Sequence, residues 1–331
     1  MTGPGPAIDH GGRLQAARRR WPSAPEPWVD LSTGINPHAY PMPALKQARW
    51  ARLPEPEEEQ RLCAIAAEAY GVADPAMVVA APGTQILISL LPLLLPSPEV
   101  RVLGPTYAEH AAGWSASGAA VTVVPTFDEL AGARTAVLCQ PNNPDGRRQT
   151  PADLLRCAAD CARRGGVLVV DEAFVDLEPG LLSVAGALPC PGLVVLRSFG
   201  KTYGLAGVRL GFLLAEPALA ARVRTALGPW AVSGPALQVG CAALADSDWR
   251  AATARRLQQD GARLDARLAA AGMTVIGRTR LFRLAETTEA ARWQARLGEQ
   301  GILVRAFAER PNWLRFGIPD WQVFGSKHFF F

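Results

Sequence analysis

The sequence predicts an α/β protein: a large domain built on a mostly parallel sheet with helices on both faces, followed by a smaller α+β domain. Three observations lead to this prediction. The chain has 331 residues, which exceeds the roughly 100–200 residues of one typical domain. Short apolar runs alternate with helical stretches rich in Ala, Leu and Arg. From about residue 229 this alternation changes to a long helix and a second group of strands.

Five apolar, β-branched runs are the predicted strands of the large domain, at residues 100–105, 119–125, 135–141, 166–174 and 192–199. Between the third and fourth runs, residues 151–164 carry apolar side chains at helical spacing. Thr150 is a candidate N-cap for this helix, and Pro151 stands at its first position. Strands that alternate with helices in this way favour a mostly parallel sheet.

The C-terminal part, residues 229–331, is predicted to be the smaller domain. It opens with a long Arg- and Ala-rich helical stretch at residues 248–271. Three apolar runs follow as predicted strands, at residues 273–277, 281–286 and 301–307. The chain then ends in an aromatic tail, from Trp321 onward, that lacks helical periodicity.

The balance of charge is only mildly basic, with 34 Lys and Arg residues against 30 Asp and Glu residues and a net charge of +4. A nucleic-acid-binding domain normally carries a stronger basic patch, so we expect no nucleic acid partner. The excess suits a small anionic substrate, although a solvated helix face explains the densest cluster, residues 18–20, at least as well.

Cysteine and hydropathy patterns argue against a metal site and a membrane anchor. The six Cys residues include no C-x-x-C pair and only four His residues could assist them, so we expect reduced, mostly buried thiols and no metal. The N-terminus has no apolar leader segment. The longest apolar stretch, residues 86–95, is broken by Pro92 and is too short to span a bilayer. We therefore expect a soluble, cytoplasmic protein with no membrane partner.

Residues 198–211, SFGKTYGLAGVRLG, follow the last predicted strand of the large domain and concentrate the motif signals. A P-loop would need its first glycine where Val195 stands, so the phosphate-binding loop of a nucleoside triphosphatase is incomplete. The S-x-x-K motif of penicillin-binding enzymes fits Ser198 and Lys201, but the companion K-T-G is missing because Tyr203 stands at its glycine. Taken alone, the segment would also fit a surface lysine.

The remaining interpretation is that this segment resembles the Schiff-base segment of class I and II aminotransferases, which depend on pyridoxal 5'-phosphate (PLP). The resemblance implies that Lys201 holds PLP as a Schiff base and that Ser198 and Arg209 bind its phosphate. Asp171 ends a predicted strand where the family places the carboxylate that keeps the pyridine nitrogen protonated. Asn143, in an N-N-P turn, matches the residue that hydrogen-bonds the phenolic oxygen of PLP.

Further positions match the family in the same order along the chain. Gly83, Thr84 and Gln85 precede an apolar helix, whose N-terminal N–H groups are a natural phosphate site. Tyr107 stands where the family stacks an aromatic ring on the cofactor, and Arg315 matches the arginine that binds the substrate α-carboxylate. Each residue alone is as easily a cap, a turn or a packed side chain. The whole series implies a fold-type-I PLP enzyme that forms a homodimer.

The N-terminal segment points to one branch of this family. His10-Gly11-Gly12 and residues 30–37 (DLSTGINP) resemble the branch that decarboxylates L-threonine O-3-phosphate in cobalamin biosynthesis more than the histidinol-phosphate aminotransferases. In such relatives an arm, here residues 1–40, lies over the active site and precedes the large PLP-binding domain, here residues 41–228. The resemblance therefore places His10, Gly34 and Asn36 near a small phosphorylated amino-acid substrate.

Two departures from the family pattern leave alternatives open. Phe174 replaces a tyrosine that shares the phenolic oxygen, and Leu53 replaces a tyrosine that many relatives extend to the PLP phosphate of the partner subunit. A histidinol-phosphate aminotransferase, which would share every PLP residue named above, is the main alternative. A PLP-sensing regulatory module would need more residues before the enzyme-like part to hold a DNA-binding domain. A scaffold protein of the same fold would have no need for Lys201.

Overall fold

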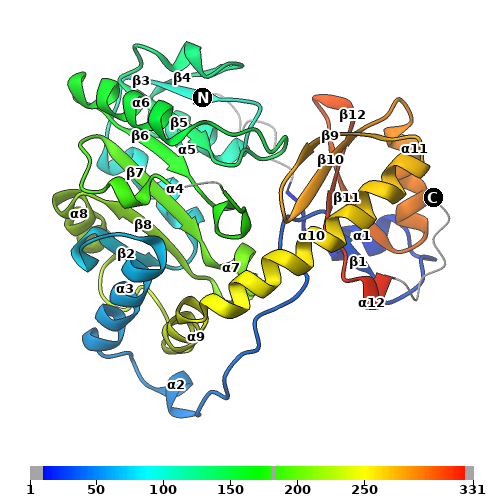
Figure 1. The fold of residues 1–331 in the computed structure, drawn as a ribbon, viewed down its shortest axis with the longest axis horizontal. Coiled ribbons are helices and arrows are strands. Elements are labelled where there is room, and N and C mark those ends of the chain that lie inside the picture. Colours follow the sequence, from blue (N-terminus) through cyan, green and yellow to red (C-terminus); the bar gives the residue numbers. More distant parts are fainter. Residues whose placement is uncertain (1–9, 181–182, 325–331) are drawn as a thin grey trace. The chain divides into compact units, whose positions relative to one another are not determined.

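The computed structural model describes residues 10–180 and 183–324 and divides into two compact units (Figure 1). The larger unit contains residues 39–143 and 147–253, and the smaller unit contains residues up to 38, residues 144–146 and residues from 254 onward. The domain boundaries that the sequence favours, after residues 40 and 228, stay predictions. Each unit is described by itself below.

A 7-stranded sheet forms the centre of the larger unit, in the order β2-β8-β7-β6-β5-β3-β4. Its strands are β2 (Val78–Ala81), β3 (Glu99–Leu103), β4 (Ala120–Val124), β5 (Thr135–Cys139), β6 (Leu168–Asp171), β7 (Leu193–Ser198) and β8 (Gly211–Ala215). Only β8 runs antiparallel to its neighbours β2 and β7, so the other strands of this sheet all point the same way. The predicted mostly parallel sheet is therefore confirmed.

Helices cover both faces of this sheet, as the sequence predicts (Figure 1). They are α3 (Pro56–Tyr70), α4 (Thr84–Leu94), α5 (Ala108–Ala116), α6 (Pro151–Arg163), α8 (Pro217–Leu227) and α9 (Gly234–Ala245), with the short α2 (Ala48–Ala51) and α7 (Phe199–Thr202). At the start of α6 the Thr150 side chain accepts a hydrogen bond from the Asp153 N–H, and Pro151 follows the cap. The predicted cap is thus confirmed.

Two apolar cores separate along the strands because successive side chains of a strand point to opposite faces. In β7, Val195 packs into the core that α3, α6 and α9 share, whereas Val194 and Leu196 pack into the core under α4, α5 and α8. Strands buried on both faces read as continuous apolar runs rather than alternating ones. This is why the sequence showed them as runs.

A 5-stranded sheet forms the smaller unit, in the order β1-β11-β12-β10-β9. Its strands are β1 (Val29–Leu31), β9 (Thr274–Arg278), β10 (Phe282–Glu286), β11 (Ile302–Phe307) and β12 (Arg310–Gly317). The pairing of β1 with β11 is parallel and the other pairings are antiparallel. Part of the segment expected to be an arm is therefore a strand of this sheet.

The helices of the smaller unit are α1 (Leu14–Arg20), α11 (Ala290–Glu299), α12 (Trp321–Phe324) and most of α10 (Ser247–Ala270), which begins in the larger unit. The helical turn at Trp321–Phe324 differs from the expectation that the tail lacks a helix. A single turn needs no apolar periodicity, which only becomes visible over several turns. The remainder of the tail, residues 325–331, lies outside the described residues.

Two expectations from composition concern cysteines and membranes. All six Cys residues are free thiols, and Cys63, Cys139 and Cys161 are buried while the other three are partly buried. Among residues 10–180 and 183–324, the structure contains no helix with the length and apolar character needed to cross a bilayer.

The close approach of β5 to the turn before β6 yields a test of the fold. A Cβ at Gly166 would lie 1.9 Å from the backbone oxygen of Arg134, so Gly166→Ala forces the backbone apart. We expect it to lower the free energy of unfolding by about 1–3 kcal/mol. Thermal or urea denaturation measures this loss. Gly186→Ala, where the nearest atom lies at 3.5 Å, is the control and should cost far less. Equal stability of the two variants would contradict the packing described here.

Candidate active site

The predicted cofactor residues of the larger unit gather at one edge of its sheet. Parallel strands end at the same edge, and α/β proteins bind ligands there, where the strand order changes direction. The strands β2, β3, β5, β6 and β7 end at this edge, and β8 starts from it. The residues that follow or precede these strand ends are Gly83, Thr84, Gln85, Tyr107, Asn143, Asp171, Ser198, Lys201 and Arg209.

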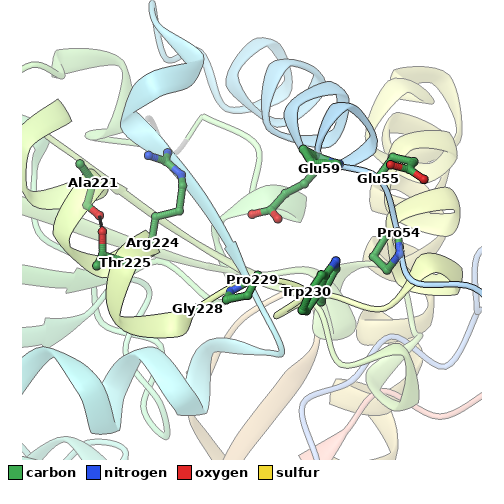
Figure 2. Close-up of a pocket in the computed structure, with 10 residues that line it drawn as sticks. Pro54, Glu55, Glu59, Ala221, Arg224, Thr225, Gly228, Pro229 and Trp230 are labelled. Carbon is green, nitrogen blue, oxygen red and sulfur yellow. Dashed lines mark hydrogen bonds between the residues drawn. The ribbon is translucent and has the colours of Figure 1, made fainter.

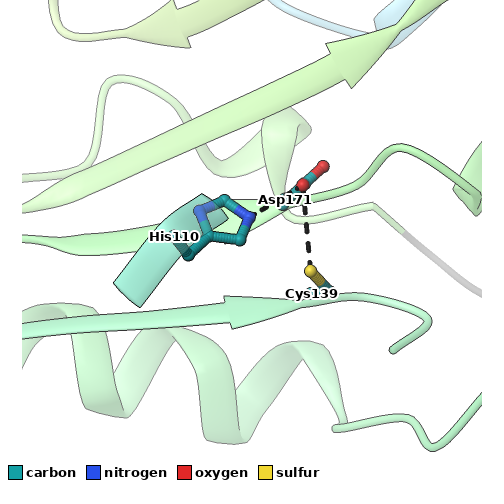
Figure 3. A group of neighbouring side chains, drawn as sticks. All are labelled: His110, Cys139 and Asp171. Atoms are coloured by element: carbon teal, nitrogen blue, oxygen red, sulfur yellow. Dashed lines mark hydrogen bonds and ion pairs between the residues drawn. The ribbon is translucent and has the colours of Figure 1, made fainter. Parts of the chain in front are cut away.

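Asp171 is the last residue of β6, and its carboxylate is buried among hydrogen-bond donors (Figure 3). Its Oδ2 lies 2.9 Å from His110 Nε2 and 3.8 Å from Cys139 Sγ, and its Oδ1 accepts the Ala173 N–H at 3.1 Å. Burial opposes ionisation, but the hydrogen bond and charge of His110, the charge of Lys201 and the Ala173 N–H together lower the pKa of Asp171. The site therefore holds a carboxylate that stays charged.

His110, on α5, is the counter-ion of this carboxylate. Burial would lower its pKa, but the neighbouring Cys139 and Asp171 raise it above the ordinary value for histidine. A protonated ring then donates from Nε2 to Asp171. The sequence analysis missed both His110 and Cys139. The signal was present only in the strand pairing, because Cys139 and Asp171 are register partners on β5 and β6.

Lys201 lies in α7, the short helix that directly follows β7. Its Nζ is 5.1 Å from the centroid of the Phe174 ring, and its charge reaches Asp171 strongly enough to help lower the pKa of that carboxyl group. This environment differs from that of a solvated surface lysine and is compatible with the predicted role of Lys201 as the cofactor lysine. Ser198, at the end of β7, is buried beside it.

A buried ionic network fixes the position of α7. Arg197 Nη1 lies 2.7 Å from Glu172 Oε2, and a second ion pair joins Arg197 to Asp176. Thr202 Oγ1 donates to Asp176 Oδ2 at 3.0 Å. These contacts clamp the residues on both sides of Lys201. Because a buried charge without its partner is costly, the network resists local rearrangement.

Gly83 and Arg209 form a cradle at the N-terminus of α4. Gly83 has φ +85°, and a Cβ there would lie 2.6 Å from Arg209 Nη2. Next to it, a Cβ at Gly211 would lie 2.6 Å from the backbone nitrogen of Thr84. The absence of both Cβ atoms leaves the guanidinium beside the first N–H groups of the helix. This arrangement fits the phosphate group of a cofactor.

The side chains of Tyr107 and Gln85 form a hydrogen bond at the same edge of the sheet. The Tyr107 hydroxyl donates to Gln85 Oε1 at 2.9 Å, and Gln85 Nε2 donates to Glu109 Oε2 at 3.2 Å. Burial raises the pKa of Tyr107 to about 12, with further contributions from nearby carboxylates, so its ring remains neutral. Asn142, the neighbour of Asn143 in the chain, donates from Nδ2 to the Pro105 carbonyl at 2.9 Å.

Arg315, on β12 of the smaller unit, is a buried cation. Its Nη2 donates to the Ser32 carbonyl at 2.7 Å. Burial and the nearby charge of Arg305 together lower the pKa of Arg315 to about 10, and the two arginines are register partners on β12 and β11. Arg315 thus remains charged at neutral pH, and two guanidinium groups on neighbouring strands favour an anionic ligand. The sequence analysis did not include Arg305.

His10, Gly34 and Asn36 also belong to the smaller unit. Asn36 is buried, and its Oδ1 accepts the His38 N–H at 2.9 Å, so this side chain shapes its own loop. Gly34 is buried in the same loop and His10 is partly buried. Their predicted contacts with a substrate stay predictions.

A pocket of about 500 Å³ lies elsewhere in the larger unit, between the N-terminus of α3 and the C-terminus of α8 (Figure 2). Glu59, Arg224 and Trp230 are among its lining residues. None of the predicted cofactor residues lines this pocket, so its volume is no evidence that it is the active site. The Trp230 side chain is 55% exposed there.

Comparison with known proteins defines the class. Residues 27–322 match the family model of aminotransferase class I and II, and the chain belongs to this family. The cofactor of the family is PLP, which the sheet-edge residues fit. The chain is 46% identical to a threonine-phosphate decarboxylase of Sinorhizobium sp. over 95% of this chain and 94% of the relative. It is 41% identical to a Pseudomonas aeruginosa protein of the same name over 94% and 93%.

Solved structures share the fold. A histidinol-phosphate aminotransferase from Sinorhizobium meliloti, determined in complex with pyridoxal-5'-phosphate, superposes with a TM-score of 0.78 at 22% identity and covers 95% of this chain and 94% of its own. An L-threonine-O-3-phosphate decarboxylase from Porphyromonas gingivalis superposes with a TM-score of 0.72 at 21% identity, covering 87% and 94%. The predicted fold-type-I architecture is confirmed.

The cradle at Gly83 provides a test of cofactor binding. Gly83→Ala pushes a methyl group into the Arg209 guanidinium and strains a positive φ. We expect the dissociation constant for PLP to rise about tenfold or more, or about 1.4 kcal/mol. Titration of the cofactor-free protein with PLP, followed by absorbance, measures this change. Gly207→Ala, which meets nothing within 4 Å, should bind PLP like the unmodified protein. Unchanged affinity in Gly83→Ala would contradict the phosphate assignment.

Proposed function

We propose that this protein is a PLP-dependent decarboxylase that converts L-threonine O-3-phosphate to (R)-1-amino-2-propanol O-2-phosphate, a step of cobalamin biosynthesis. The observation that carries the proposal is the buried Asp171 carboxylate facing the Lys201 amine at one sheet edge, beside the cradle of Gly83 and Arg209. The choice of substrate is supported by the two threonine-phosphate decarboxylases that match nearly the whole chain.

The cofactor would be held by residues of the larger unit. Lys201 would bind it covalently through Nζ, and the phosphate would bind at Gly83, Thr84, Ser198 and Arg209. When bound, PLP supplies an electron sink for the electron pair left when a bond at the substrate Cα breaks.

Asp171 would neutralise the protonated pyridine nitrogen, and this role requires the carboxylate to be ionised. His110 supports ionisation by donating to Oδ2. The Tyr107 ring would pack against the cofactor, and Asn143 would hydrogen-bond its phenolic oxygen. Phe174 has no hydroxyl and packs beside the Lys201 amine instead.

The choice between decarboxylation and amino transfer depends on which bond at Cα is held perpendicular to the cofactor ring. Arg315 would bind the substrate carboxylate through its two-pronged guanidinium. His10, Gly34 and Asn36 would help to bind the phosphate end. A substrate held at both ends has one orientation about its N–Cα bond. We propose that this orientation would favour loss of the carboxylate over loss of the Cα proton.

We propose further that the protein is a cytoplasmic homodimer. The larger unit exposes large apolar side chains: Trp230, which lines the pocket of Figure 2, is 55% exposed, and Trp50 and Leu53, shortly before the lining residue Pro54 in the chain, are 68% and 64% exposed. Exposed apolar side chains of this size favour a protein interface. Leu53 stands where many relatives carry a tyrosine directed to the partner's cofactor. An apolar contact across the interface would replace that hydrogen bond.

Threonine phosphate is the substrate that tests this proposal. Purified protein reconstituted with PLP should release CO2 from L-threonine O-3-phosphate, and Lys201→Ala should lose both CO2 release and the visible absorption of the bound cofactor. Trapped CO2 and the phosphorylated amine product are measured. Transfer of the amino group of histidinol phosphate to 2-oxoglutarate, with no CO2 from threonine phosphate, would favour the aminotransferase alternative instead.

Arg315 tests how the substrate is oriented. Arg315→Ala should lower kcat/KM for threonine phosphate by about 100-fold, close to 3 kcal/mol, because a charge-assisted, two-point contact is lost. Arg315→Lys keeps the charge without the two-pronged geometry, so its kcat/KM should lie between those of Arg315→Ala and the unmodified protein. Arg310→Ala removes an exposed arginine of the same strand and serves as the control. PLP absorbance should remain in all three variants. A normal kcat/KM in Arg315→Ala would rule out its role as carboxylate anchor.

A further inference from the structure

Cys139 lies where its thiol can act on the proposed cofactor carboxylate. It is the last residue of β5 and the register partner of Asp171 at the end of β6. In parallel strands, register partners direct their side chains to the same face of the sheet. The side chains of Val137 and Val169, two residues earlier on each strand, pack in the core beneath α5, which carries His110. The strand geometry therefore brings all three groups to one face.

The three groups are buried, and their contacts converge on a single oxygen. Cys139 is 4% exposed, His110 1% and Asp171 4%. Cys139 Sγ is 3.8 Å from Asp171 Oδ2, the same oxygen that His110 Nε2 reaches at 2.9 Å (Figure 3). A buried carboxylate needs donors on both oxygens, since water cannot supply them. The Ala173 N–H donates to Oδ1, and Cys139 and His110 both contact the second oxygen, Oδ2.

A metal ion is the competing interpretation of this triad. The three ligand atoms lie within 4.8 Å of one another, a spacing compatible with a metal ion. However, the 2.9 Å separation of His110 Nε2 and Asp171 Oδ2 is that of a direct hydrogen bond. The bonds from both groups to a zinc ion would need about 2.0–2.2 Å each, which places the two atoms farther apart. The geometry favours a hydrogen-bonded triad.

We infer that Cys139 is a positioning residue for the cofactor: its thiol donates to Asp171 Oδ2 and fixes the carboxylate and the His110 ring in the orientation that meets the pyridine nitrogen. This inference rests on the proposed function only in assigning the pyridine nitrogen to Asp171. The contact between Cys139 Sγ and Asp171 Oδ2 does not depend on that assignment. Tyr107 and Lys201, which also interact electrostatically with Asp171, remain unchanged in the variants below.

The test follows the His110 ring by NMR in the full-length protein, with and without PLP. The chain has only four His residues, so the ring signals can be assigned by substitution. Because the Cys139 thiol and His110 share Asp171 Oδ2, removal of the thiol in Cys139→Val should shift the midpoint of the His110 titration by about one pH unit, a tenfold change in proton affinity. Cys139→Ser retains a donor and should stay near the unmodified protein. In the PLP-bound protein, the pH profile of cofactor absorption should shift only in Cys139→Val.

Controls separate this role from simple packing. Cys63 is a buried thiol of α3 whose pKa burial raises to about 11, and Cys63→Val should leave the His110 titration unchanged. Cys139→Ala provides a smaller substitution if Cys139→Val unfolds. Unchanged His110 midpoints in both Cys139→Ala and Cys139→Val, or identical behaviour of Cys139→Ser and Cys139→Val, would overturn the inference. Neither readout uses substrate, so failure of decarboxylation alone would leave this test intact.

Discussion

One buried charge, the Asp171 carboxylate, places the strongest constraint on the larger unit. A carboxylate away from water remains ionised only if donors and positive charges surround it. Here they come from three different elements: the His110 ring from α5, the Cys139 thiol from β5 and the Ala173 N–H just beyond β6. The order of strands in the sheet is what brings these elements together. The cofactor chemistry therefore depends on correct assembly of the sheet.

A second buried charge, Arg197, binds the residues that directly follow Asp171 in the chain. Its ion pairs with Glu172 and Asp176 join the end of β7 to the segment after β6. Asp171 and Glu172 are neighbours in sequence, yet each serves a different cation. Alternation along an extended segment directs their side chains to opposite sides. One side thus carries the carboxylate proposed to meet the cofactor, and the other holds the helix that carries Lys201 in place.

Much of this fold was predictable because its strands are buried on both faces. Continuous apolar runs such as residues 192–199 are typical of strands that are covered on both faces of the sheet in α/β proteins. The antiparallel strand β8 was not predicted because its apolar run, Gly211–Ala215, is separated from the Ala- and Leu-rich helix α8 by Glu216 alone. A short apolar run beside a helix cannot be assigned from periodicity alone.

The site was predictable only where a residue stands in a motif. Asp171 ends a strand and Lys201 follows one, and both stand in segments that resemble a known motif. His110, Cys139 and Arg305 stand in no motif, and only their contacts with residues distant in sequence place them at the site. Cys139 and Asp171 are 32 residues apart and become neighbours only through the pairing of β5 and β6. Arg305 likewise depends on its register with Arg315. Strand register is not visible in a single sequence when both faces are buried.

The reversed direction of β8 has a consequence for how the site can vary. The chain leaves the sheet edge after Ser198 and returns to it at Gly211, so both ends of this loop are fixed by strands that pair with each other. Lys201 and Arg209 therefore lie in one loop whose length limits their separation. An inserted or deleted residue between them would disturb both of these proposed cofactor contacts. We therefore expect the loop between Ser198 and Gly211 to keep a constant length. Changes in substrate specificity would then come from residues outside this loop.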